Sequence, residues 1–226
     1  MGKQRLTPTS FVDNQLLKRH NKCLITVNKR QPMIQADATD ALFDMARTHR
    51  FFTDRPVGED LLLRLYDLVK FAPTESNFCP MRLTFVKSKD GFDRVIEAAA
   101  PGNKDKIRSA PVVVIVAHDL EFNQHISQLA PHMDADAFAK NPANVLATKA
   151  VHNTWMQAGY LIMAARALGL DCGPMVGFDA KKINTSFYEN STWRASMLIS
   201  LGYGVGGDQI RARGHRLSFD EACEIR

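Results

Sequence analysis

The chain has 226 residues, of which 45% are hydrophobic and 23% are charged, a balance that suits a globular domain with a full core and excludes a disordered or fibrous protein. The net charge of +5 comes from the first 35 residues, where seven Lys and Arg accompany one Asp, so that stretch carries +6 and residues 36–226 carry −1. This nearly neutral body has no basic stripe interleaved with aromatic residues, and we expect it not to bind nucleic acid.

Residues 1–35 predict a basic, poorly ordered N-terminal extension without a catalytic role. An organellar presequence and an artefact of the chosen start codon are alternatives for this stretch. A nucleic-acid-binding role for the protein would depend on these residues alone.

The four cysteines are Cys23, Cys79, Cys172 and Cys223, and they lack a C-x-x-C pair or zinc-ligand spacing. We expect reduced thiols, no structural metal and a cytoplasmic location, with Cys79 and Cys172 as small buried residues. The longest apolar stretches are too short or too interrupted to span a bilayer, so we expect no membrane segment.

Apolar residues at helical spacing and short β-branched runs alternate along the body of the chain. In chain order they predict a helix over 37–49, a helix over 58–72, a strand over 83–88, a helix over 91–100, a strand over 110–119, a long helix over 144–170 that ends at Gly169, a strand and turn over 171–179, a short helix over 180–187, a strand over 196–204, and a basic tail with a short helix over 211–225.

The run over 110–119 is continuously apolar, which is typical of a strand buried on both faces, so we expect it in the centre of the sheet. The helix over 144–170 is long and rich in apolar residues, and we expect it at the heart of the fold. Because the elements do not alternate as regular β-α-β units, the order favours an α+β fold, with one domain over 36–226.

The stretch "APTESNFCPMR", residues 72–82, joins a predicted helix to a predicted strand, a connection that usually needs about 2–6 residues. It carries Thr74, Glu75, Ser76 and Asn77, four side chains that can form hydrogen bonds. Their presence in an unusually long connection raises the question of what they face.

Two arginine clusters lie at opposite ends of the body. The first is Arg47 and Arg50, with Thr48 and His49 between them, and the second is Arg211, Arg213 and Arg216. Planar guanidinium groups form paired, charge-assisted hydrogen bonds with phosphate, so the two clusters could close on one anion. Alternatively, they are solvated surface.

Two further segments carry candidate binding residues. Asn103 and Lys106 precede the central strand in a predicted loop, where function is often found. Gly173 and Gly177, on either side of Pro174, permit a close approach of the backbone to a flat ligand. Each of these residues also has a purely structural explanation, as a turn former or an exposed lysine.

Taken in order, five segments resemble the FMN-binding segments of the nitroreductase family. They are "RTHRFF", "APTESN", "GNKDK", "ALGLDCGPMVGFD" and the late "RAR". The resemblance covers residues 37–226, and the order of the five blocks is more specific than any single block. Within the family the chain is most similar to the malonic semialdehyde reductases of pyrimidine utilisation, through "APTESNFCPMR", "LISLGYG" and "RLSFDEAC" as well.

This resemblance implies a homodimer of α+β subunits, each with a mainly antiparallel central sheet flanked by helices, and FMN in two sites at the subunit interface. Arg47 and Arg213, helped by Arg211, would hold the FMN phosphate, and Thr48 and His49 would contact nearby cofactor atoms. Cations and donors beside the pyrimidine edge favour the reduced flavin, and Arg50, Asn103 and Lys106 would supply them. The flavin ring would be contacted by Pro73, Thr74, Ser76 and Asn77, partly across the interface, and on its other side by Pro174, Met175, Val176 and Gly177.

The implied activity is a ping-pong hydride transfer from NADH or NADPH through FMN to an oxidised substrate. The closest resemblance implies a small aldehyde such as malonic semialdehyde, reduced to 3-hydroxypropionate. A broad-specificity nitroaromatic or quinone reductase is the alternative, and a flavin-binding protein without turnover is another. His49, Thr74 or water could protonate an aldehyde oxygen. Well-known nitroreductases carry glutamate where this chain has Val176, so a carboxylate role there does not carry over.

Residues 121–145 are too many for a plain connector. In the nitroreductase family such a segment caps the site. We therefore expect Phe122, His125, His132 and Phe138 to shape substrate choice, with a surface helix as the alternative for each.

Overall fold

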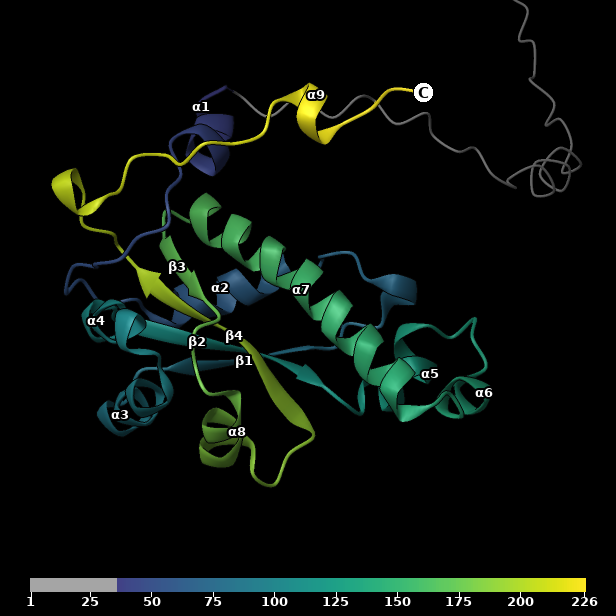
Figure 1. Cartoon of the computed structure of the whole chain (residues 1–226). Helices are drawn as coiled ribbons and strands as arrows, with labels where there is room; N and C mark the ends of the chain where they lie inside the picture. Colours follow the sequence, from purple (N-terminus) through teal and green to yellow (C-terminus); the bar gives the residue numbers. More distant parts are fainter. Residues whose placement is uncertain (1–35) are drawn as a thin grey trace, which may run out of the picture. The chain divides into compact units, whose positions relative to one another are not determined.

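Residues 36–226 are described by the structure, a computed structural model, and they appear in colour in Figure 1. The extension predicted for residues 1–35 lies outside the described residues. Within the described part, four strands form one sheet in the order β1-β2-β4-β3, and all neighbouring strands are antiparallel. The strands are β1 (Met81–Val86), β2 (Val112–Asp119), β3 (Asp171–Met175) and β4 (Trp193–Gly202). The predicted α+β class, with an antiparallel sheet and the 110–119 run inside it, is confirmed.

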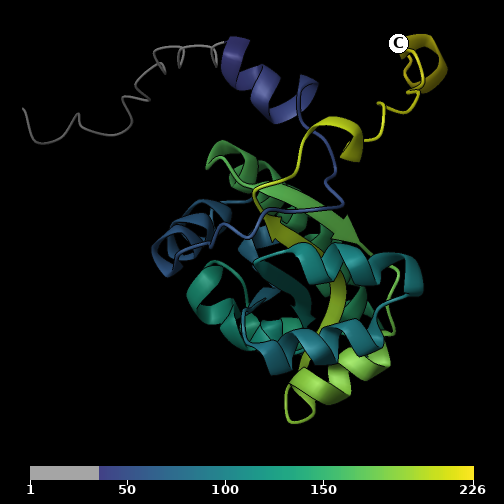
Figure 2. The ribbon, with the colours of Figure 1, turned by 90° about the vertical axis from the view of Figure 1, so that its left-hand side faces the viewer.

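Helices cover both faces of this sheet (Figure 2). They are α2 (Glu59–Val69) and α7 (Ala143–Ala167) on one face, and α3 (Lys89–Ala98), α4 (Pro101–Ser109) and α8 (Ala180–Tyr188) on the other. Alternate residues of β2 belong to opposite layers: Val112 and Val114 pack beneath α2 and α7, whereas Val113 and Ile115 pack beneath the other three helices. The unbroken apolar run of β2 is thus explained by burial on both sides.

The long helix α7 lies across one face of the sheet and buries Leu161 and Ala165. It is followed by Gly169, which has a φ of 75°, a left-handed conformation that glycine adopts without the steric penalty of a Cβ. The Gly169 N–H donates to the carbonyl oxygen of Arg166 at 2.9 Å. The predicted end of the helix is therefore confirmed.

Two observed elements begin two residues before their predicted starts. α3 begins at Lys89 because the hydroxyl of Ser88 caps it, accepting from the Gly91 N–H at 3.1 Å. β1 begins at Met81, which pairs with His118 of β2. Side-chain caps and cross-strand partners extend both elements beyond the hydrophobic pattern.

The first predicted helix is too long. α1 (Ala36–Thr39) continues into the π-helix η1 (Asp40–Asp44), and the chain then becomes extended. Thr48 forms a parallel bridge with Cys172, and the His49 N–H donates to the Cys172 carbonyl oxygen at 3.0 Å. Pairing with the edge of β3 therefore ends helical structure before residue 47.

The loop predicted around Asn103 and Lys106 is wrong, because both residues lie in α4. Pro101 occupies the start of the helix, where its missing N–H removes no helical hydrogen bond.

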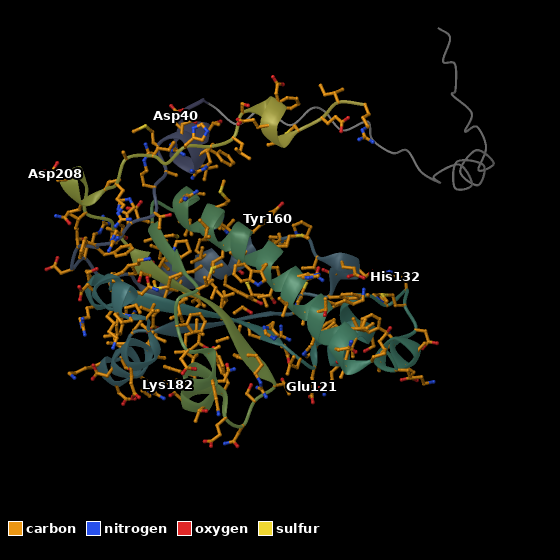
Figure 3. All side chains as sticks on the ribbon, in the orientation of Figure 1. Asp40, Glu121, His132, Tyr160, Lys182 and Asp208 are labelled. Atoms are coloured by element: carbon orange, nitrogen blue, oxygen red, sulfur yellow. The ribbon has the colours of Figure 1, made fainter. Side chains whose placement is uncertain are left out.

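Residues 121–145 fold into three short helices. These are η3 (Phe122–His125), α5 (Ile126–Leu129) and α6 (Ala135–Ala139). Phe122 and Phe138 are buried against Phe78, with ring centroids 5.4 and 4.8 Å from that of Phe78. The alternative of a surface helix is therefore wrong for these two phenylalanines. His125 and His132 are exposed, and Figure 3 shows His132 beside α5 and α6, far from Asp40.

After β4 the chain forms η4 (Gly207–Gln209) and the short helix α9 (Phe219–Ala222). α9 starts with a capping box, in which the Ser218 N–H and hydroxyl donate to the Glu221 carboxylate at 2.9 and 2.8 Å. No helix between residues 36 and 226 combines the length and the apolar character that crossing a bilayer requires.

Candidate functional site

A cavity of about 600 Å³ lies where the end of η1, α4, the end of α7 and the C-terminal tail meet. Its walls combine residues from both ends of the described chain. The lining residues are Phe43, Asp44, Ala46, Arg47, Thr48, Arg50, Gly102, Asn103, Lys106, Arg166, Arg211, Ala212, Arg213, Gly214 and Arg216. The structure thus brings the two arginine clusters of the sequence together in one place.

The cavity is strongly cationic. Arg47, Arg50, Lys106, Arg166, Arg211, Arg213 and Arg216 line it, and Asp44 is the one acidic residue among its walls. Within residues 36–226, no carboxylate lies within 4.0 Å of any of these seven cations. Such a concentration of cations without neutralising partners is suited to an anion with several negative charges.

Several of these arginines donate to backbone carbonyl groups. Arg213 Nη2 donates to the carbonyl oxygens of Phe43, Asp44 and Ala46 at 2.9, 2.5 and 3.2 Å. Arg166 Nη1 donates to the Leu42 carbonyl oxygen at 3.0 Å. These bonds hold the tail and the end of α7 against the end of η1, and they leave the positive charges unneutralised.

The charged form of Lys106 is destabilised by its burial among these cations. Burial lowers the pKa of Lys106 below its ordinary value, and the neighbouring charge of Arg50 lowers it further. A bound anion would reverse the second effect, because it would favour the charged ammonium group.

Glycines let β3 and the segment after it approach the residues that line the cavity closely. A Cβ at Gly173 would lie 2.7 Å from the His49 carbonyl oxygen and 2.9 Å from Lys106 Cδ. A Cβ at Gly177 would lie 2.8 Å from Asn103 Nδ2, which donates to the Gly177 carbonyl oxygen at 2.9 Å. The strand β3 and its exit are therefore packed directly on the residues that line the cavity.

His49 does not place its side chain in the cavity. The imidazole is buried, with Nε2 3.2 Å from the Asp171 carboxylate. Its other nitrogen, Nδ1, has no hydrogen-bond partner among residues 36–226 and lies where a Cβ on Gly204 would come within 1.8 Å. Any contact of His49 with a ligand in this cavity would therefore come from its backbone.

The segment after β3 also stays outside the walls. Pro174 is half-buried and Met175 belongs to the core, whereas Val176 is 61% exposed. The Phe178 N–H donates to the Val176 carbonyl oxygen at 3.0 Å, which turns the chain back and presents the Val176 side chain to solvent. Val176, which is exposed, and Gly177, which is half-buried, therefore form a rim next to Asn103.

The loop with Pro73, Thr74, Ser76 and Asn77 does not line the cavity of its own subunit. η2 (Glu75–Asn77) lies in it, and Pro73, Ser76 and Asn77 are exposed. The Thr74 hydroxyl accepts from the Cys79 N–H at 3.2 Å, and Asn77 Nδ2 donates to the Leu129 carbonyl oxygen at 2.8 Å. A role of this loop at a flavin thus requires a second subunit, as the family resemblance implies.

The sequence interpretation missed Arg166 as a wall of the cavity. It lies in the last turn of α7, where a cation is commonly explained by the helix dipole. The described residues hold no group of three or more His, Cys, Asp or Glu placed to bind a metal ion. Cys172 is buried as expected, and burial raises the pKa of its thiol to about 12. Cys79 is only half-buried, so the prediction for that thiol is wrong.

Comparison with known proteins identifies the family of the chain. The model of the nitroreductase family matches residues 44–203. A Ralstonia nicotianae protein called "Putative NADH dehydrogenase/NAD(P)H nitroreductase" is 42% identical over 86% of this chain and 99% of its own length. A Stenotrophomonas maltophilia protein with the same name is 45% identical over 85% of this chain and 97% of its own.

Solved structures share the fold at low sequence identity. A nitroreductase-like protein of Bacillus subtilis superposes with a TM-score of 0.76 at 23% identity, covering 85% of this chain and all of its own. A protein of Exiguobacterium sibiricum, solved in complex with FMN, has a TM-score of 0.75 at 18% identity over 85% of this chain and 98% of its own. With a family model that matches most of the chain and relatives above 40% identity, this protein belongs to the nitroreductase family.

Proposed function

We propose that this protein is an FMN-dependent NAD(P)H oxidoreductase. The observation that carries the proposal is the cavity lined by seven cations with no carboxylate partner within residues 36–226. The phosphate of FMN is a dianion of the kind that such a cluster binds. Relatives named for NAD(P)H and a solved neighbour that holds FMN support the same conclusion.

The residues present fit this cofactor. Arg47, Arg211 and Arg213 would hold the phosphate, with Arg166 adding positive charge nearby. Asn103 uses its Nδ2 for the Gly177 carbonyl oxygen, which leaves its Oδ1 to accept from an imide N–H like that of a flavin.

Amino-acid side chains do not carry hydride between substrates. Bound FMN would supply this transfer, from NAD(P)H to a second substrate. Arg50 and Lys106 would stabilise negative charge that develops beside them, because both lack carboxylate partners in the described chain. The exposed rim at Val176 would leave one side of the site open to a substrate. Because the His49 imidazole is taken up by Asp171, we propose that Thr74 or water delivers the proton.

We propose that the protein is a homodimer. Large apolar side chains are exposed on α2 and α7, among them Leu63, Tyr66, Trp155, Met156 and Tyr160, the last labelled in Figure 3. Large apolar side chains exposed on two neighbouring helices are typical of a protein interface. Sedimentation equilibrium would give twice the chain mass, and a monomer at micromolar concentration would contradict this part of the proposal.

For the substrate, we propose a small aldehyde such as malonic semialdehyde, which the sequence segments favour and whose carboxylate suits a cationic site. The names of the relatives support the alternative, a broad nitroaromatic or quinone reductase. Specificity constants decide between them, since open flavin sites reduce many electrophiles. A kcat/KM for malonic semialdehyde below those for nitroaromatics and quinones would favour the alternative.

The test of the proposed function is the visible spectrum of the purified protein under anaerobic conditions. We expect added FMN to remain with the protein through gel filtration, NADH or NADPH to bleach it, and an electron acceptor to restore the colour. Protein that fails to retain FMN would overturn the proposal, and retained flavin that neither nucleotide bleaches would indicate a binding protein without turnover.

A further inference from the structure

The loop from Thr74 to Cys79 has an unusual backbone. Ser76, Asn77 and Cys79 have φ values of 44°, 60° and 44°, and none of them is glycine. The left-handed region costs a residue with a Cβ about 1–2 kcal/mol, and although asparagine adopts it more readily, Ser76 and Cys79 at these angles store strain within a short stretch. Strain of this kind persists only where the surroundings determine the conformation, and it is found mainly at functional sites.

The surroundings that hold this loop belong to one stripe of α7. Asn153 Oδ1 accepts from the Glu75 N–H at 2.6 Å, and Gln157 Oε1 accepts from the Met81 N–H at 3.0 Å. Lys149 forms an ion pair with the Glu75 carboxylate. Residues 149, 153 and 157 are spaced by four and therefore share one face of the helix.

The burial of the Asn153 and Gln157 amides is unfavourable by itself. Asn153 and Gln157 are 3% exposed on the inward face of α7, where Ala150, Ala158 and Leu161 are also buried. Burying an amide is unfavourable unless its hydrogen bonds are made. The Asn153 oxygen accepts from the N–H of Glu75 within the loop, and the Gln157 oxygen accepts from that of Met81, the first residue of β1 after the loop. Neither side chain lines the cavity.

A third anchor lies between the other two. Phe78, 1% exposed, inserts between Phe122 and Phe138, the residues expected from the sequence to shape the site directly. Phe78 is thus buried in the aromatic cluster, and Glu75 and Met81 on either side of it are hydrogen-bonded to α7. The side chains of Ser76 and Asn77 remain exposed.

We propose that Asn153 and Gln157 are positioning residues, which hold the strained loop Thr74–Cys79 in the conformation that receives the flavin of the partner subunit. This inference rests on the proposed function. It assigns to two buried amides of α7 an effect on cofactor affinity, although neither lines the cavity.

The test compares three variants of the full-length protein. Asn153→Leu removes the acceptor at similar volume, and Asn153→Asp keeps it. Thr154→Val is the matched control, because Thr154 is the next residue of the same helix, fully buried, and its hydroxyl has no hydrogen-bond partner in the described part of the chain. Amide hydrogen exchange of residues 74–81 without FMN and the Kd for FMN are measured on each, with thermal unfolding alongside.

We expect Asn153→Leu to speed exchange at Glu75 and its neighbours and to weaken FMN binding about tenfold, which corresponds to the 1.4 kcal/mol that a decade in Kd represents. Asn153→Asp and Thr154→Val should stay within about threefold of the parent protein in Kd, so that loss of stability alone does not explain the effect. Unchanged exchange in Asn153→Leu, or faster exchange with an unchanged Kd, would overturn the inference and leave the proposed function intact. A parent protein that does not bind FMN would instead refute the proposed function.

Discussion

Replacing Arg213 with alanine tests the cavity most directly. In the structure Arg213 donates to the described chain from Nη2 alone, to three carbonyl oxygens at the end of η1. A guanidinium has five N–H donors, so Nη1 and Nε are left for a phosphate. The same side chain thus serves as a clasp for the tail and as a contact for the ligand.

The two roles differ in magnitude. A hydrogen bond between charged partners contributes about 1.5–3 kcal/mol, which corresponds to a roughly 10- to 100-fold increase in the Kd for FMN when it is lost. The bonds to carbonyl oxygens are exposed to water, so their loss should lower the free energy of unfolding by about 1 kcal/mol or less.

The assay is a titration of FMN fluorescence against the parent protein and two variants, at fixed ionic strength. Arg108→Ala is the control, because Arg108 lies on α4, is paired with Asp105 and does not line the cavity. Both substitutions remove one positive charge, so the net charge of the protein changes by the same amount, and only the Arg213 variant loses a charge inside the cavity. Equal Kd values for the Arg213 and Arg108 variants would refute the assignment of the phosphate to this cavity.

Three further outcomes follow from buried groups. Asp119→Ala breaks the buried ion pair between Asp119 and Arg82 of β1, and it should lower the free energy of unfolding in urea by about 3 kcal/mol. Asp93→Ala breaks an exposed ion pair and should lower this free energy by less than about 1 kcal/mol. Similar losses in the two variants would contradict this reasoning. At pH 8 a thiol reagent should modify exposed Cys223 and spare Cys172, whose pKa is raised to about 12; rapid labelling of Cys172, mapped by mass spectrometry, would show otherwise. Burial lowers the pKa of Lys106, so the folded protein binds that proton more weakly than the unfolded chain, and stability should rise with pH between the lowered pKa and the ordinary value of 10.5. Lys106→Met should remove this rise and stabilise the FMN-free protein at pH 7 while weakening FMN binding, and a lower Tm for that variant would contradict the assignment of strain to this lysine.

Elements whose pattern reflects burial could be predicted from the sequence. The apolar run of β2 and the helical spacing of apolar residues along α7 reflect their burial in the core, and Gly169 marks the end of α7. The convergence of residues 47–50 and 211–216 on one anion was also a possibility raised by the sequence, since arginines with no adjacent acids stand out in a nearly neutral body.

Features fixed by single long-range contacts could not be predicted. The imidazole of His49 turns inward because Asp171, far along the chain, pairs with it. The left-handed residues of the 74–79 loop include no glycine, so no residue type signalled them. Asn153 and Gln157 carry no pattern of their own on the long helix, because the backbone groups that they bind belong to a segment far away in the sequence.

A cavity with seven cations and one acid has a practical consequence at the bench. An anion with several charges that enters the cavity reduces the repulsion between its positive side chains and stabilises the folded protein by mass action. Inorganic phosphate from a buffer and nucleotides carried over from a lysate are anions of this kind. Melting temperatures and cofactor affinities measured in phosphate and in Tris will therefore differ. The buffer and the purification procedure therefore have to be the same wherever two preparations of this protein are compared.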